Sequence, residues 1–385
     1  MAFTKIKGPK IAAIVTSVPL RRFDNLRDTT EFTRDEVKKV VAMAGVSARR
    51  LADESICSSD LCIAAAEKAL TLLGWERDSV DALIMVTQTP DYLLPSTSCI
   101  AHKSLRLSEN CASFDVGLGC SGYPYGMWLA SMMISTNGIK RVLLLHGETP
   151  SRFSDKSDRA VSLLFGDAGS ATALEVADQV DSPDWFFGLY TDGQGYGDMI
   201  IEGGGFRERF CDDLRKYCVR MDGAKIFNFT IKRVPDLIRE TLNGAGMQMD
   251  DIDYFIFHQS NRYIINFLSN KMKIPSERLP MTIKEYGNTG GPSIPLTMTL
   301  GGLIRPSEGP LRMMLLGYGV GLSWSSALIS MGPDTILDHI NKRINDDNKV
   351  NKNEYKLRHV YDIFSYGNLL FTDFLRWCCE IDIDV

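Results

Sequence analysis

Four uninterrupted runs of apolar residues mark the regular segments of this chain. They read DALIMVT (81–87), RVLLLHG (141–147), DYFIFHQ (253–259) and LRMMLLGYG (311–319). Each run is continuous rather than alternating, which is typical of strands buried on both faces of a parallel sheet. We therefore expect four core strands covered by helices on both sides.

Helical patterns precede these runs. The sequence predicts helices over 58–74 and 224–246, with Gly74 and Gly244 as their ends, because glycine readily adopts the left-handed conformation of a helix C-cap. Near the N-terminus, KIAAIVTSVP (10–19) fits a first strand better than a signal peptide. Alternating helices and buried strands predict a layered α/β fold.

The pattern repeats itself along the chain. Asp81 and Arg141 each introduce an apolar run, and Asp253 and Arg312 do the same about 172 residues later. Two independent matches at one offset indicate an ancient duplication with two halves of similar topology.

The predicted division is 1–180 for the first half, 181–332 for the second and 333–385 for a linker and extension. Residues 339–359 are rich in Asn, Lys and Asp and predict a mobile linker. The chain then turns apolar again up to residue 385. This last part fits either a segment packed on the surface or an element that binds a partner.

Composition narrows the class of protein. The chain has 385 residues, 44% hydrophobic and 24% charged, with a net charge of −5, so we expect no general attraction to nucleic acid or anionic membranes. No apolar run is long enough to span a bilayer. Nine scattered cysteines without a CxxC pair argue against a disulfide framework or a zinc site and favour reduced thiols in the cytoplasm.

Three polar side chains stand where active sites of α/β sheets gather, beyond the carboxyl ends of strands. Cys120 follows the apolar run 112–116 and precedes a helical pattern, His258 ends the third core run, and Asn288 lies in a glycine-rich loop. A helix N-terminus favours the thiolate of Cys120, the form that attacks a carbonyl.

Each of these residues also has a purely structural interpretation. Cys120 fits a buried inert cysteine, His258 a satisfied core histidine, and Asn288 a turn asparagine. One Cys, one His and one Asn make a poor metal ligand set, so no metal is expected. The glycine clusters at 202–205 and 317–321 do not match GxGxxG, and we expect no nicotinamide cofactor.

Five stretches, taken together and in order, resemble the β-ketoacyl-acyl-carrier-protein synthase III family, and the likeness spans nearly all of residues 10–332. They are FDVGLGCSGYPYG (114–126), SRFSDKSDRAVSLLFGDAGSATAL (151–174), FHQSN (257–261), YGNTGGPSIP (286–295) and GYGVGLSWSSALI (317–329). The resemblance implies a thiolase-like, duplicated, five-layered αβαβα fold.

The resemblance also implies a two-step mechanism. Cys120 takes an acyl group from a thioester on coenzyme A or an acyl carrier protein, with the backbone N–H groups of Cys120 and Val320 as the oxyanion hole. A malonyl-acyl-carrier-protein then loses CO2, and His258 and Asn288 donate hydrogen bonds to the developing enolate. The carbanion attacks the acyl group and gives a 3-oxoacyl product. The thioesters are substrates, so no separate cofactor is implied.

Further contacts follow from the same resemblance. It implies substrate contacts at Arg159, Arg262 and Tyr318, and a homodimer in which Leu94 of one subunit closes the acyl pocket of the other. The adenine-stacking tryptophan of the family and its neighbouring arginine fall at Lys39 and Met43.

The carrier-docking arginine of the family falls at Tyr263, beside Arg262, and one oxyanion glycine falls at Val320. Together with Lys39 and Met43, these departures favour a carrier-protein donor and a specialised pathway for lipid, polysaccharide or secondary metabolite.

Two other functions stay open. An acyltransferase of the same family would pass the acyl group from Cys120 to an amine or hydroxyl and would release no CO2. A non-catalytic relic that scaffolds a complex would form no acyl adduct at all.

Overall fold

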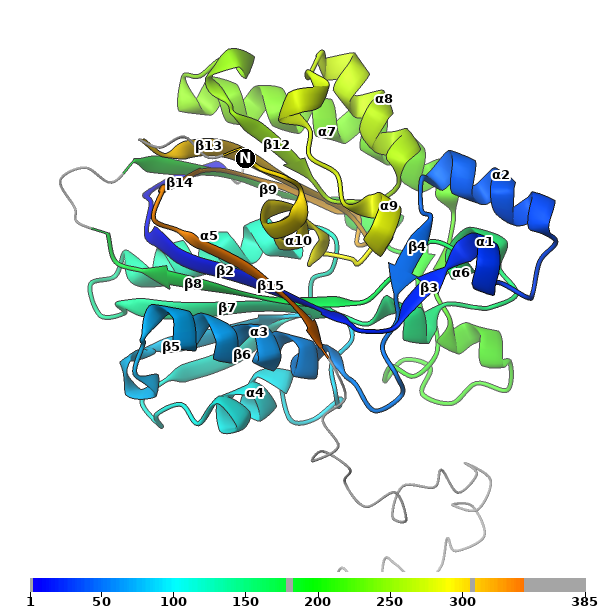
Figure 1. Cartoon of the computed structure of the whole chain (residues 1–385), viewed down its shortest axis with the longest axis horizontal. Coiled ribbons are helices and arrows are strands. Elements are labelled where there is room, and N and C mark those ends of the chain that lie inside the picture. The colour runs from blue at the N-terminus through cyan, green and yellow to red at the C-terminus, as the bar shows by residue number, and fades with distance from the viewer. Residues whose placement is uncertain (1–2, 178–182, 305–308, 343–385) are drawn as a thin grey trace, which may run out of the picture. The chain divides into compact units, whose positions relative to one another are not determined.

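The computed structural model describes residues 3–177, 183–304 and 309–342. Two large sheets and three layers of helices alternate as α/β/α/β/α (Figure 1). The predicted five-layered fold is therefore confirmed.

The first sheet has six strands and carries most of the N-terminal half. Their order is β15 (Ile336–Lys342), β2 (Lys10–Pro19), β8 (Ala168–Glu175), β7 (Arg141–Glu148), β5 (Ala82–Val86) and β6 (Ala112–Val116). Helices α3 (Ser58–Leu73) and α4 (Thr97–Leu105) cover its outer face.

The second sheet has five strands and carries the C-terminal half. Their order is β1 (Phe3–Lys7), β9 (Asp184–Thr191), β14 (Ser323–Met331), β13 (Leu311–Gly319) and β12 (Tyr254–Phe257). Helix α7 (Gly223–Ala245) packs on its outer face, and α8 (Arg262–Met272) packs on α7.

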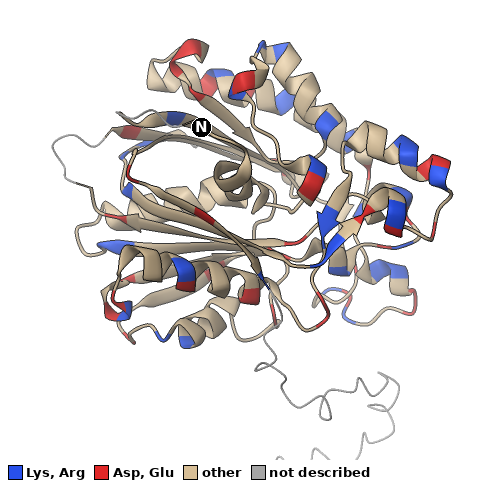
Figure 2. Cartoon of the chain, viewed as in Figure 1, with Lys and Arg blue, Asp and Glu red and all other residues tan. Residues whose placement is uncertain are grey.

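Helices α5 (Gly122–Ile134) and α10 (Ser293–Leu300) lie between the two sheets and contact both (Figure 1). Their sequences, GYPYGMWLASMMI and SIPLTMTL, contain no charged residue, as expected for helices covered on both sides. Charged residues gather instead on the outer helices and at the edges, and the middle layer is almost free of them (Figure 2).

Short elements at one end of the sheets complete the described fold. They are α1 (Asn25–Asp28), α2 (Arg34–Ala44), α6 (Arg159–Ser162), α9 (Ile283–Tyr286), the ribbon β3 (Arg22–Asp24) with β4 (Ala48–Arg50), and the ribbon β10 (Met199–Ile200) with β11 (Arg220–Met221). No helix among the described residues combines the length and apolar character that a membrane span requires.

The duplication is visible in the strand order. The series β2-β8-β7-β5 in one sheet and β9-β14-β13-β12 in the other have the same order and the same sequence of antiparallel, antiparallel and parallel pairings. The two matched residue pairs of the repeat make the same backbone bond. The N–H of Asp81 donates to the Arg141 carbonyl at 3.0 Å, and that of Asp253 to the Arg312 carbonyl at 2.9 Å.

The boundaries differ from the sequence expectation in two respects. The strand β1 pairs with β9 in the sheet of the second half, and β15 pairs with β2 in the sheet of the first. Residues 336–342, which the sequence assigned to the linker and extension, therefore belong to the folded unit. The extension from residue 343 to 385 lies outside the described residues.

The predicted helix ends were right in one case and wrong in the other. Gly74 caps α3 in the left-handed conformation, with φ 61°. The helix α7 instead continues through Gly244 to Ala245, and Gly246 is its cap with φ 67°. Gly244 is required for packing, because a Cβ there would overlap the Phe3 ring.

The two aspartates of the repeat accept hydrogen bonds from backbone N–H groups at the start of a neighbouring strand. These bonds predict a difference in stability between variants that lack one aspartate or the other. The Asp81 carboxylate accepts the N–H groups of Lys140 at 2.6 Å and Arg141 at 2.9 Å. Among the described residues, the exposed Asp253 accepts one such group, the Arg312 N–H at 2.7 Å. We expect Asp81→Ala to lower the free energy of unfolding by about 1–2 kcal/mol and Asp253→Ala by less. Urea denaturation of both variants checks this, and a larger loss for Asp253→Ala would contradict it.

Candidate active site

The nucleophile loop connects β6 to α5, and Cys120 stands two residues before the helix begins. Its side chain is buried, with 7% exposure. Gly319, at the end of β13, lies directly against it, with φ 155°. A Cβ at Gly319 would lie 2.8 Å from Cys120 Cβ and 2.9 Å from its Sγ, so only glycine fits here.

The backbone N–H groups of Val320 and of Cys120 itself both act on the Cys120 thiol and favour its charged form. These are the two groups predicted as the oxyanion hole, and the fold brings them together although they lie 200 positions apart in the chain. A side chain at position 320 is compatible with this arrangement, since only the N–H group takes part.

Burial raises the pKa of the Cys120 thiol to about 11; the Glu148 charge acts in the same direction, and the Val320 and Cys120 N–H groups act against it. The Cys120 N–H, just before the start of the helix, favours the thiolate as expected, but it does not decide the charge state of the free protein. Desolvation outweighs the donors, and the group is a thiol at neutral pH.

His258 follows β12, where its backbone N–H donates to the Leu316 carbonyl at 2.7 Å. The ring is buried, and Nδ1 lies 2.9 Å from the Ser293 hydroxyl. Ser293 also accepts the Gln259 N–H at 3.1 Å, which leaves its own proton free for Nδ1. Burial lowers the pKa of His258 to about 4, with a backbone hydrogen bond to Gly290 opposing it, so the imidazole is neutral.

Asn288 follows α9 and is held in one orientation. Its Oδ1 accepts the Gly290 N–H at 2.9 Å, and its Nδ2 donates to the Ser260 carbonyl at 3.3 Å. Ser260 in turn donates its N–H to the His258 carbonyl at 2.9 Å, which ties the two loops together. Nδ2 has two hydrogens, so one stays available for a ligand.

Tyr318 lies beside His258, buried on β13. Its hydroxyl donates to the His258 carbonyl at 3.2 Å, and the two rings pack edge to face with centroids 5.6 Å apart. Burial raises the pKa of the Tyr318 phenol, and the nearby Cys120 acts in the same direction. These contacts make Tyr318 a support of the His258 loop, while the predicted substrate contact stays a prediction.

The two predicted substrate arginines both attach to α2. The Arg159 guanidinium pairs with Glu36 at 2.7 Å, and Arg262 donates to the Ala42 carbonyl at 2.8 Å. Leu94 lies elsewhere, in the loop between β5 and α4, where its side chain is 86% exposed. Their roles towards substrate and partner stay predictions.

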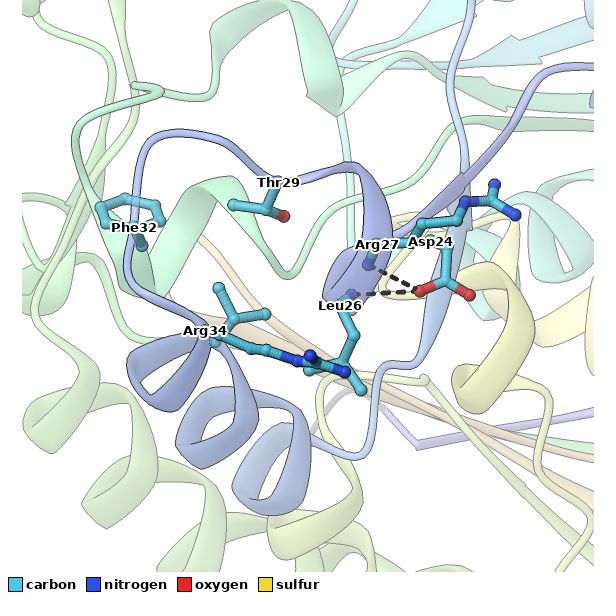
Figure 3. Close-up of a pocket in the computed structure, with 7 residues that line it drawn as sticks. Asp24, Leu26, Arg27, Thr29, Phe32 and Arg34 are labelled. Atoms are coloured by element: carbon cyan, nitrogen blue, oxygen red, sulfur yellow. Dashed lines mark hydrogen bonds between the residues drawn. The ribbon is translucent and has the colours of Figure 1, made fainter.

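A separate pocket of about 370 Å³ lies between α1 and the start of α2 (Figure 3). Asp24 caps α1 on one side of it, accepting the N–H groups of Leu26 and Arg27. Phe32 and Arg34 line the other side. None of the predicted site residues lines this pocket.

Sequence reasoning missed three buried residues near the site. Ser293, the partner of His258, lies within the quoted asparagine motif, but a serine there carries no signal of its own. His146 lies near the end of the apolar run RVLLLHG of β7, and Glu148 follows it directly. A polar residue at the end of such a run is the signal that singled out His258 on β12.

Comparisons with known proteins identify the family of the chain. Residues 114–193 match the family model 3-Oxoacyl-[acyl-carrier-protein (ACP)] synthase III, and residues 242–331 match the model of its C-terminal part. The Beta-ketoacyl-[acyl-carrier-protein] synthase III of Natranaerobius thermophilus is 32% identical over 333 residues, covering 84% of this chain and 99% of that protein.

Solved structures give the same result. A 3-oxoacyl-(acyl-carrier protein) synthase from Burkholderia xenovorans LB400 is 42% identical with a TM-score of 0.84, covering 88% of this chain and 99% of that one. FabH from Pseudomonas aeruginosa PAO1 is 27% identical with a TM-score of 0.74, covering 85% and 98%. The chain therefore belongs to the 3-oxoacyl-[acyl-carrier-protein] synthase III family of condensing enzymes.

Proposed function

We propose that this enzyme loads an acyl group onto Cys120 and condenses it with a malonyl thioester, releasing CO2 and a 3-oxoacyl thioester. One observation carries the proposal. Two backbone N–H groups act on the buried thiol, and two neutral side-chain donors, His258 and Asn288, lie on loops that a hydrogen bond joins.

In the first step the Cys120 sulfur attacks the carbonyl carbon of an acyl thioester. The N–H groups of Cys120 and Val320, which act on the thiol in the free protein, stabilise the oxyanion as charge develops. The carbon–sulfur bond to the carrier breaks, and the proton of Cys120 leaves with the released carrier thiol. Because the pKa of the free thiol is high, Cys120 loses its proton in the same step in which its sulfur attacks the carbonyl carbon.

In the second step the malonyl thioester loses CO2 and leaves an enolate. With the Ser293 hydroxyl as the donor to Nδ1 of His258, 2.9 Å away, the imidazole proton is placed on Nε2, where it can donate to the enolate oxygen. Asn288 Nδ2 provides the second hydrogen bond. Because both donors are neutral, they stabilise the enolate without protonating its carbon. The carbon attacks acyl-Cys120, and the Cys120 thiolate leaves and takes up a proton.

An acyl carrier protein suits this enzyme as the donor and as the malonyl carrier. The relatives described above are named as acyl-carrier-protein synthases, which supports the carrier. Arg159 is engaged by Glu36, and Lys39 stands where the family has a tryptophan, which disfavours coenzyme A. The exposed Leu94 is proposed to reach the acyl pocket of a second copy in a homodimer.

The first half-reaction predicts a covalent adduct. Incubation with a panel of acyl-carrier and acyl-CoA thioesters should add one acyl mass to the protein, and peptide mass spectrometry should place it on Cys120. Cys120→Ala should form no adduct, whereas Cys99→Ala, which removes an exposed thiol of α4, should keep it. An adduct that persists in Cys120→Ala would contradict the assignment.

The second half-reaction predicts a separation of the two steps. His258→Ala should form acyl-Cys120 at a rate within about threefold of wild type, yet release CO2 from malonyl carrier about 10²–10³ times more slowly, because one of the two enolate donors is lost. His102→Ala, on the outer helix α4, is the control and should keep both rates. Loss of acylation alone in His258→Ala would instead make the histidine the base for the thiol.

A further inference from the structure

The end of β7 carries two buried polar side chains that the mechanism does not use. His146 and Glu148 are two residues apart, so they point to the same face of the strand. They lie under consecutive glycines of the Asn288 loop. A Cβ at Gly290 would lie 3.0 Å from Glu148 Cγ, and a Cβ at Gly291 would overlap the His146 ring.

Glu148 also holds the other side of the site. Its Oε1 accepts the Gln88 N–H at 2.8 Å, and its Oε2 accepts the Thr89 hydroxyl at 3.0 Å. The side-chain oxygen of Gln88 lies against Gly119, the residue before Cys120. The Glu148 side chain therefore contacts two loops: its carboxyl group bonds to the loop that supports the nucleophile, and its Cγ lies beside the loop that carries Asn288.

The charge of Glu148 acts on Cys120. Burial raises the pKa of Glu148 to about 8, the Gln88 and Thr89 donors act against this, and the Asp167 charge adds to it. The titratable groups around Glu148 are His146 on the same face of β7, Asp167 before β8, Cys62 on α3 and Cys120. Tyr318 faces Cys120 from β13.

We propose that Glu148 is a positioning residue, an inference that rests on Cys120 as the proposed nucleophile. Glu148 joins the loops of Gln88 and Gly290 across the active site. Its negative charge, when present, makes Cys120 less reactive. The sign follows from electrostatics, since a carboxylate disfavours a second negative charge nearby. Below about pH 8 Glu148 holds a proton, so its charge does not lower the reactivity of Cys120. Above that pH Glu148 is ionised, and the reactivity of Cys120 is lowered.

The test is the rate of Cys120 alkylation by iodoacetamide, a neutral reagent, from pH 6 to pH 10, followed by peptide mass spectrometry. In wild type the rate should climb with pH and then climb less steeply as Glu148 ionises. Glu148→Gln keeps an acceptor for Gln88 but no charge, so its rate should match wild type at pH 6.5. At pH 9.5 it should exceed wild type by about two- to fourfold, because a lower thiol pKa gains thiolate but loses some nucleophilicity.

Asp167→Asn is a second variant that leaves Glu148 in place. Removing the Asp167 charge lowers the pKa of Glu148, so the less steep part of the profile should move to lower pH. A Glu148→Gln profile that differs from wild type by the same factor at every pH would mean a merely structural effect and would overturn the proposal. So would an unmoved profile in Asp167→Asn.

The positioning role has its own readout. Glu148→Ala removes the support under Gly290 and should reduce CO2 release from malonyl carrier at least tenfold at pH 7, while Glu148→Gln should restore it. Equal CO2 release in Glu148→Ala and wild type would refute the positioning role. Alkylation needs no substrate, so absence of any acyl adduct would overturn the proposed function while leaving the charge effect standing.

Discussion

The active site depends on the close approach of the β13 backbone, at Gly319, to the sulfur atom of Cys120. Gly319 of the second half lies in van der Waals contact with Cys120 of the first, and any side chain there would displace the nucleophile. This contact brings the Val320 N–H to the sulfur. The loop that carries Asn288 approaches the same nucleophile loop, since a Cβ at Gly291 would lie 2.5 Å from the Gly119 carbonyl oxygen. The apolar middle helices α5 and α10 pack between the two sheets and contact both.

Burial then decides the charge state of every group near the sulfur. It holds the Cys120 thiol and, near neutral pH, most of the Glu148 carboxyl in their protonated forms, and it keeps His258 and His146 neutral, with the pKa of His146 lowered to about 3. A site made of neutral donors suits a reaction in which negative charge appears only transiently, on a thioester oxygen and on an enolate. The donors of the free protein are therefore in place for the reaction, and they carry no fixed charge beside the substrate.

Much of this could be predicted from the sequence, because it depends on local signals. Continuous apolar runs predicted the core strands, and a repeated Asp and Arg offset predicted the two halves. Glycine-rich loops singled out Cys120 and Asn288, and the end of an apolar run singled out His258. What could not be predicted depends on contacts across the fold. The exchange of β1 and β15 between the halves, the Ser293 partner of His258 and the burial that raises the pKa of Cys120 each involve residues far apart in the chain.

The central claim is that acyl-Cys120 is consumed by carbon–carbon bond formation. A single-turnover experiment tests it most directly: preformed acyl-enzyme is mixed with malonyl-acyl-carrier-protein, and CO2, free Cys120 and product are followed by mass spectrometry. The account predicts one CO2 and one 3-oxoacyl carrier for each Cys120 released. Discharge of the acyl group to an amine or hydroxyl, with no CO2 from the malonyl carrier, would contradict it.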